Sequence, residues 1–249
     1  MNSPSTKIQV PQLSVVAALT AASACAAAFV VGFSPAAAVP QQAASLSPTA
    51  SPATTPPASQ SKAAAQEIAA FARAWAGITG YNATVTIFDQ KGTQTQNLVF
   101  DYMFRKPSNV TVHVIAGPNA GVTLTWNGGP TVVARRGSGI AAMFKRTLSL
   151  HDPLVTTLRG SSIDQLSFGA ILAHGQREAG SLSEAPGELI DGVATNAVTL
   201  TLAGSSTDAG LTREVVELSA VTHLPMRVLG YEGSALVRDV EFSNVKLQS

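Results

Sequence analysis

The feature that most constrains the fold is an alternation of apolar and polar residues that begins near Tyr81 and recurs almost to the C-terminus. Successive side chains of a β-strand point to opposite faces of a sheet, so a period of two predicts strands with one apolar and one wetter face. Glycine, proline, asparagine and aspartate separate the alternating runs at short intervals. Because short turns join antiparallel neighbours, the sequence predicts a mainly antiparallel β-structure.

The alternating runs form two groups, separated by residues 137–180, where the pattern breaks. Five strands are expected before the break and four or five after it. The sequence Asn127-Gly128-Gly129, between two runs, is typical of a tight hairpin turn. The clearest runs are residues 83–89, 95–105, 110–116, 122–126, 131–136, 194–202, 211–220, 226–231 and 235–245.

Two helical segments are expected beside the strands. In residues 63–78, Phe71, Trp75 and Ile78 recur at the three-to-four spacing of an amphipathic helix. A second, short helix is expected inside the break, because Ser162 and Gln165 have the spacing of a capping box before an apolar run. The fold class is therefore mainly β (α+β), with a curved antiparallel sheet that either curls over its apolar face or is covered by the helical segments.

The N-terminal residues 1–38 are typical of an export signal. Residues 13–33 are apolar and uncharged, and Ala36-Ala37-Ala38 offers a cleavage site after Ala38. The apolar run is also nearly long enough for a retained membrane anchor, and Cys25 is a possible site of lipidation. All three alternatives take the protein out of the cytoplasm, to the periplasm or the cell surface.

Residues 39–62 are expected to be a disordered linker. They contain five prolines among alanine, serine, threonine and glutamine, with Leu46 as the one large apolar residue. Such a segment buries too little apolar surface to offset the entropy of ordering it. Residues 63–249 are then left as one folded domain.

The charge of the domain gives no reason to expect nucleic-acid binding. Lys7 and Lys62 are the only charged residues before Ala63, so the domain carries 14 basic against 15 acidic groups. Binding to nucleic acid depends on neutralising phosphates. Two basic pairs, Arg135-Arg136 and Lys145-Arg146, are local exceptions to this balance, and we expect them to be solvated loop charges.

The sequence contains no recognisable catalytic or metal-binding motif. None of the histidines has a second ligand at the spacing typical of a metal site, and no G-x-S-x-G sequence occurs. Glu184, Glu188 and Asp191 cluster in a segment rich in glycine and proline, where we expect solvated loop charges. The domain is therefore predicted to be no enzyme and to need no metal or cofactor. The histidines are His113, His151, His174 and His223.

The apolar faces of the strands suggest where a ligand would bind. Such a face needs cover, and two alternatives are open: helices and loops fill it completely, or they leave a concavity that accepts an apolar ligand. The candidate lining residues are Phe100, Tyr102, Phe104, Val112, Val114, Leu124 and Trp126.

Several short motifs in residues 63–249 together resemble the bacterial lipoprotein-carrier superfamily, the LolA-like fold, which includes periplasmic stress-sensor relatives. The resemblance implies an unclosed β-barrel whose concave face is lidded by helices and holds lipid or lipoprotein acyl chains without covalent chemistry. The motifs are Phe104-Arg105-Lys106-Pro107, Trp126-Asn127-Gly128-Gly129, Leu148-Ser149-Leu150-His151-Asp152-Pro153, His223-Leu224-Pro225-Met226-Arg227 and Val240-Glu241-Phe242-Ser243-Asn244-Val245.

Two functions are consistent with these observations. The first is a carrier or sensor that binds lipid or lipoprotein acyl chains in the concave face of the sheet. The second is a tethered module with a filled core that binds an envelope protein partner, which the long linker would allow.

Overall fold

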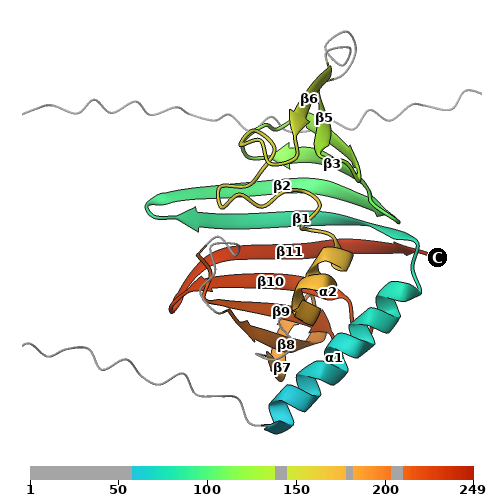
Figure 1. The fold of residues 1–249 in the computed structure, drawn as a ribbon, viewed down its shortest axis with the longest axis vertical. Helices are drawn as coiled ribbons and strands as arrows, with labels where there is room; N and C mark the ends of the chain where they lie inside the picture. The colour runs from blue at the N-terminus through green and yellow to red at the C-terminus, as the bar shows by residue number, and fades with distance from the viewer. Residues whose placement is uncertain (1–57, 138–144, 178–181, 203–209) are drawn as a thin grey trace, which may run out of the picture. The chain divides into compact units, whose positions relative to one another are not determined.

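The computed structural model describes residues 58–137, 145–177, 182–202 and 210–249 (Figure 1). All of them belong to one compact unit, Pro52–Ser249. The expected cleavage site after Ala38, the cysteine at position 25 and most of the expected linker lie outside the described residues. Among the residues that are described, none of the helices is long and apolar enough to span a membrane.

The described residues form one eleven-stranded sheet in which every neighbouring pair is antiparallel. The order is β6-β5-β4-β3-β2-β1-β11-β10-β9-β8-β7, so the sheet stays open, with β6 and β7 at its edges. The predicted fold class is confirmed. The strands are β1 (Gly80–Lys91), β2 (Gln94–Arg105), β3 (Asn109–Ala116), β4 (Val122–Asn127), β5 (Thr131–Arg136), β6 (Lys145–Ser149), β7 (Leu182–Ile190), β8 (Val193–Thr201), β9 (Arg213–Ser219), β10 (Pro225–Glu232) and β11 (Ala235–Gln248).

Two successive meanders meet in the middle of this sheet. The strands β1 to β6 run outward in one direction and β7 to β11 return from the other side, so that the first and last strands pair with each other (Figure 1). Val85 of β1 lies opposite Phe242 of β11 on one side and opposite Phe100 of β2 on the other. This pairing joins the apolar faces of both meanders into one continuous inner face.

Both edge strands were missed by the sequence pattern, and for physical reasons. The five residues of β6 contain one buried side chain, Leu148, too few for alternation to be recognised. In β7, Pro186 lies beside a register shift, an irregularity that an edge strand tolerates because it pairs on one side only. Glu184 and Glu188 therefore lie in β7, and their prediction as loop residues was wrong.

The two basic pairs also lie on strands and not in loops. Arg135 and Arg136 end β5, and Lys145 and Arg146 begin β6. For Lys145 and Arg146 the loop assignment was wrong because β6 was not recognised as a strand, whereas Arg135 and Arg136 end the run 131–136 that was itself predicted as a strand. All four side chains are nevertheless exposed, as expected.

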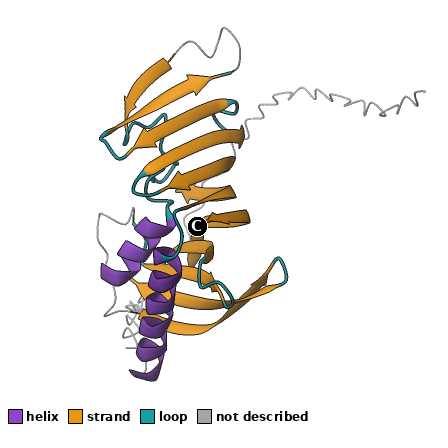
Figure 2. Ribbon diagram, turned by 90° about the vertical axis from the view of Figure 1, so that its right-hand side faces the viewer, coloured by secondary structure: helices purple, strands orange, loops and turns teal. Residues whose placement is uncertain are grey.

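Both helices, α1 (Ala58–Ala76) and α2 (Phe168–Arg177), lie on one face of the sheet (Figure 2). α1 contacts β7, β8 and α2, and its predicted apolar stripe is buried, with Phe71 1 % exposed. The helix begins before the predicted residue 63 and ends two residues before the predicted Ile78. Its last residue is followed by Gly77, which favours helix termination.

The second helix starts later than the capping box predicts. The backbone N–H of Ser162 does donate to Gln165 Oε1, at 3.0 Å, but the following residues form turns. The functional cap is Ser167, whose hydroxyl oxygen accepts from the N–H of Ala170 at 3.1 Å. The insertion therefore covers the sheet mostly with an ordered loop, followed by ten helical residues.

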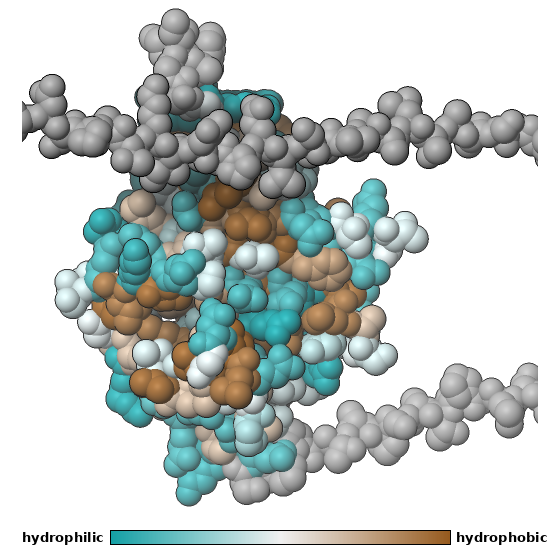
Figure 3. Space-filling model, turned by 180° about the vertical axis from the view of Figure 1, so that it is seen from behind, coloured by the Kyte–Doolittle hydropathy of each residue, from teal (hydrophilic) through white to brown (hydrophobic). Residues whose placement is uncertain are grey.

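The face without helices is stabilised by polar contacts. Figure 3 shows this side of the molecule, where hydrophobic and hydrophilic side chains are mixed. Arg227 of β10 donates two hydrogen bonds to Asp239 of β11, at 2.8 and 2.6 Å. These bonds raise the pKa of the Arg227 guanidinium above its usual value, so Arg227 keeps its positive charge.

Lys106, just after β2, fixes the end of α1 against the sheet. Its Nζ donates to the backbone carbonyl of Trp75 at 2.6 Å and lies 4.4 Å from the centroid of the Trp75 ring. A cation at a helix C-terminus satisfies a free carbonyl and interacts favourably with the helix dipole.

Replacing Lys106 with Met should destabilise the domain. The change removes the hydrogen bond and the cation–π contact while it keeps the apolar stem, so we expect a loss of about 1 kcal/mol in the free energy of unfolding. Urea denaturation measures the loss. The matched control is Lys91→Met, an exposed lysine at the end of β1, and equal stability of the two variants would contradict this role.

Candidate ligand-binding cavities

The larger cavity, of about 710 Å³, lies between α2, the segment before it and the inner face of β9, β10 and β11. Its volume is within the range of known small-molecule sites, roughly 300–1,000 Å³. Polar groups line the rest of it, so the cavity has an apolar part and a polar part. The apolar part is formed by Leu166, Ala170, Ile171, Ala173, Leu211, Val228, Val240 and Phe242.

Residues 157–166, here called the strap, cross the inner face and are held there by a buried polar cluster. The carboxylate of Asp89, which is fully buried, accepts from Arg238 Nε and from the backbone N–H of Arg159, both at 3.2 Å. Arg238 also donates to the hydroxyl of Ser161. Because Asp89 faces inward from β1, the strap is pinned to the centre of the sheet.

The guanidinium of Arg159 strengthens this attachment. Its side chain is 2 % exposed, and it forms an ion pair with Glu232 and donates to the carbonyl of Gln90 at 2.5 Å. The backbone N–H of Leu158 donates to Gln96 Oε1 at 2.7 Å. The strap is thus bonded to β1, β2, β10 and β11 by charged and polar side chains. The bonds to Asp89 are buried, where charge-assisted bonds are strong, whereas the Glu232 side chain is 45 % exposed.

A histidine links α2 to the sheet beside the larger cavity. His174 Nε2 lies 3.1 Å from Glu214 Oε2, and His174 Nδ1 lies 3.2 Å from an Arg177 nitrogen. Arginine can only donate, so Nδ1 accepts and Nε2 carries the proton that Glu214 receives in the hydrogen bond. All three residues line the cavity, and they give it polar atoms that a ligand head group could contact.

A second, smaller pocket of about 150 Å³ lies on the other side of the strap, over β2, β3 and β4. Its lining is mainly apolar and includes Leu98, Val122 and Leu154. Ser161 and Leu166 line both cavities. The strap is therefore the partition between them.

The seven lining residues predicted from the sequence fall into two sets, and none lines the larger cavity. Four of them, Phe100, Val112, Val114 and Leu124, line the smaller pocket. Tyr102 and Phe104 are buried in the core, and Trp126 packs against it. That these residues contact a ligand stays a prediction.

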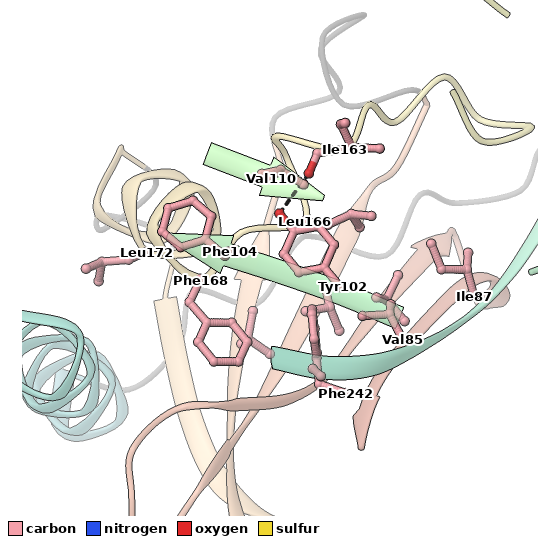
Figure 4. Packing of buried hydrophobic residues seen from close by; sticks show 14 of the residues in the cluster. Val85, Ile87, Tyr102, Phe104, Val110, Ile163, Leu166, Phe168, Leu172 and Phe242 are labelled. Atoms are coloured by element: carbon pink, nitrogen blue, oxygen red, sulfur yellow. Dashed lines mark hydrogen bonds between the residues drawn. The ribbon is translucent and has the colours of Figure 1, made fainter. Parts of the chain in front are cut away.

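Aromatic side chains hold the start of α2 on the sheet. The rings of Tyr81 and Phe168 stack with centroids 4.0 Å apart, and the Tyr81 hydroxyl accepts from the backbone N–H of Phe168 at 3.2 Å. The Tyr102 hydroxyl donates to the carbonyl of Ile163 in the strap at 2.9 Å (Figure 4). Burial raises the pKa of both hydroxyls above the usual value.

The residues of the larger cavity were overlooked although the sequence carries a signal for some of them. Val240 and Phe242 alternate with polar residues in β11, as Val85 and Ile87 do in β1. The same alternation places Asp89 on the apolar face, and a charge there indicates a buried partner. That the partner is Arg238 depends on the pairing of β1 with β11, which the sequence does not specify.

The charged side chains near the cavities are held in pairs. Among the described residues, no three histidine, aspartate or glutamate side chains are grouped so that they could hold a metal ion. The acidic and basic side chains around the strap are paired with each other. What the larger cavity offers is apolar volume with polar atoms beside it.

Comparison with known proteins finds similarity in structure but none in sequence. No family model matches the chain, and no curated protein matches it. Among the solved structures to which the chain is similar is a LolA superfamily protein. These similarities concern the arrangement of the fold, so the function must be inferred from the cavities of this chain.

Three of these structures illustrate the similarity. The lipoprotein LppX of Mycobacterium tuberculosis is 16 % identical, with a TM-score of 0.44, over 74 % of this chain and 95 % of that one. LprF of Mycobacterium bovis is 16 % identical, with a TM-score of 0.42, over 74 % and 93 %. A LolA superfamily protein of Nitrosomonas europaea is 12 % identical, with a TM-score of 0.38, over 75 % and 94 %.

Replacing Asp89 with Asn should destabilise the domain strongly. The change leaves Arg238 without its buried counter-charge, and breaking a buried ion pair costs about 3 kcal/mol or more. Denaturant unfolding measures the loss, and Asp101→Asn, an exposed aspartate on β2, is the matched control. A loss below about 1 kcal/mol, the value typical of exposed pairs, would show that the cluster does not hold the strap.

The free energy of unfolding should fall as the pH rises above about 10, the usual pKa of tyrosine. In the unfolded chain, Tyr81 and Tyr102 lose their protons near that pH, whereas in the folded domain burial keeps them protonated. The unfolded state then binds fewer protons, which lowers stability with rising pH. Urea denaturation on both sides of this pH should show a smaller fall for the double variant Tyr81→Phe/Tyr102→Phe than for the wild type.

Proposed function

We propose that the domain is a non-catalytic protein of the bacterial envelope that holds the acyl chain of a lipid or lipoprotein in its larger cavity, as a carrier or a sensor. The observation that supports this most is the cavity of about 710 Å³ on the inner face, lined by eight apolar side chains. The apolar N-terminal segment supports a location outside the cytoplasm.

The energetics of such a site are favourable. Each buried methylene contributes about 0.8 kcal/mol, so about ten methylenes would contribute roughly 8 kcal/mol before the costs of association are subtracted. Arg177, His174 and Glu214 line the same cavity and offer hydrogen bonds to a polar head group. In this proposal the four predicted residues of the smaller pocket, Phe100, Val112, Val114 and Leu124, would contact an acyl chain on the other side of the strap.

Filling the larger cavity should abolish lipid binding. Ala170 of α2 lines it, and Ala170→Phe places a ring in the space that the chain would occupy. We expect the variant to lose at least about tenfold in affinity for a fluorescent fatty acid, because a bulky group replaces volume that the ligand needs. The matched control is Ala69→Phe, at an exposed position of α1, which should bind like the wild type.

Native mass spectrometry of the protein purified from its host identifies the ligand. A bound species with the mass of a lipid, absent from Ala170→Phe, is the expected result. If neither wild type nor variant retains or binds lipid, the acyl-chain function is wrong. A protein partner captured by the domain in the absence of lipid would then favour the alternative, a tethered interaction module.

A further inference from the structure

Four cations gather at one end of the hairpin formed by β5 and β6. Arg135 of β5 lies directly opposite Lys145 of β6, and Arg146 lies opposite Ala134. Side chains alternate between faces along a strand, so Arg135 and Lys145 lie on one face of the hairpin and Arg136 and Arg146 on the other. The cationic end, defined here as these four residues, is therefore basic on both faces.

Within the part of the chain that the structure describes, no ion pair compensates for these charges. The residues between the two strands in sequence, 138–144, carry no charge. Like charges directly opposite each other, as Arg135 and Lys145 are, destabilise a sheet. An anionic partner bound to these side chains would reduce the repulsion between them.

The position of the cationic end gives the domain an electrostatic polarity. The rest of residues 63–249 has ten basic against 15 acidic groups, and β6 is an edge strand, on the opposite side of the sheet from the α1-covered edge β7 (Figure 1). Near a negatively charged surface, such a distribution turns the β6 edge toward that surface and the remainder away from it.

Apolar side chains reach the surface near the same end. Val122, which lines the smaller pocket, pairs with Arg136. The N–H of Val122 donates to the carbonyl of Asn119, and Asn119 Nδ2 donates to the carbonyl of Leu154 at 3.2 Å. Leu154 lines the pocket and is 51 % exposed. Cations beside exposed apolar groups are typical of surfaces that bind anionic membranes.

We propose that the cationic end, Arg135, Arg136, Lys145 and Arg146, docks the domain on the anionic surface of a lipid bilayer. This goes beyond the acyl-chain function, because it concerns a different surface and does not require the larger cavity to be occupied. The contact is electrostatic, between guanidinium or ammonium groups and lipid phosphates. It would present the smaller pocket, next to Val122 and Leu154, to the membrane.

Vesicle flotation with the full chain tests this docking. Wild-type protein is expected to bind vesicles of phosphatidylcholine with one third phosphatidylglycerol more strongly than vesicles of phosphatidylcholine alone, and added salt should reduce the difference. The variant Arg135→Gln/Arg136→Gln/Lys145→Gln/Arg146→Gln should lose at least about tenfold in affinity for the anionic vesicles, since each cation near such a surface contributes roughly fivefold.

A matched control separates the position of the charges from their number. Lys62, Arg73, Lys91 and Lys246 are exposed, and changing all four to Gln alters the net charge equally. This control should still bind the anionic vesicles. Every variant keeps residues 1–57, so a difference between variants does not come from the N-terminal segment.

Three results would overturn the proposal: equal binding of the wild type and the variant with all four cations replaced, an equal loss in the control, or wild-type binding to single-stranded DNA or an acidic protein without binding to anionic vesicles.

If the variant does not fold, as judged by circular dichroism, Lys145→Gln/Arg146→Gln replaces it. Replacing the three arginines with lysine should preserve binding. Ala170→Phe should bind vesicles normally, which distinguishes docking from the acyl-chain function.

Discussion

The pairing of β1 with β11 is the interaction on which the rest of the structure depends. It joins two meanders, six strands and five strands, into one sheet, and it brings Asp89 of β1 beside Arg238 of β11. That buried pair in turn holds the strap across the inner face. Without it, the cover of the sheet would lack its central attachment, and neither cavity would have its present boundary.

The inner face is packed unequally along the sheet. Over β2 and β1, aromatic rings from the sheet and from α2 fill the space, as the stacking of Tyr81 on Phe168 shows. Over β9 to β11, the helix and the strap leave the larger cavity. The two alternatives for the apolar face, a filled core and an open concavity, are thus both present, on different parts of one surface.

Much of the fold could be predicted from sequence because it depends on local pattern. Alternation identified nine strands, and the stripe containing Phe71 identified α1. The edge strands escaped because pairing with a neighbour, and not their own pattern, makes them strands: Pro186 interrupts β7, and β6 buries only Leu148. The larger cavity escaped because its walls come from α2 and β9 to β11, and the distance between a helix and a sheet is a tertiary property.

The order of the strands also has a kinetic consequence. Because β11 lies in the middle of the sheet and pairs with β1, some 160 residues earlier in the chain, a ribosome must synthesise nearly the whole domain before its centre can form. Contacts so distant in sequence are costly to close and slow to form. The nascent chain therefore cannot complete its sheet until β11, the last strand in sequence, has been synthesised.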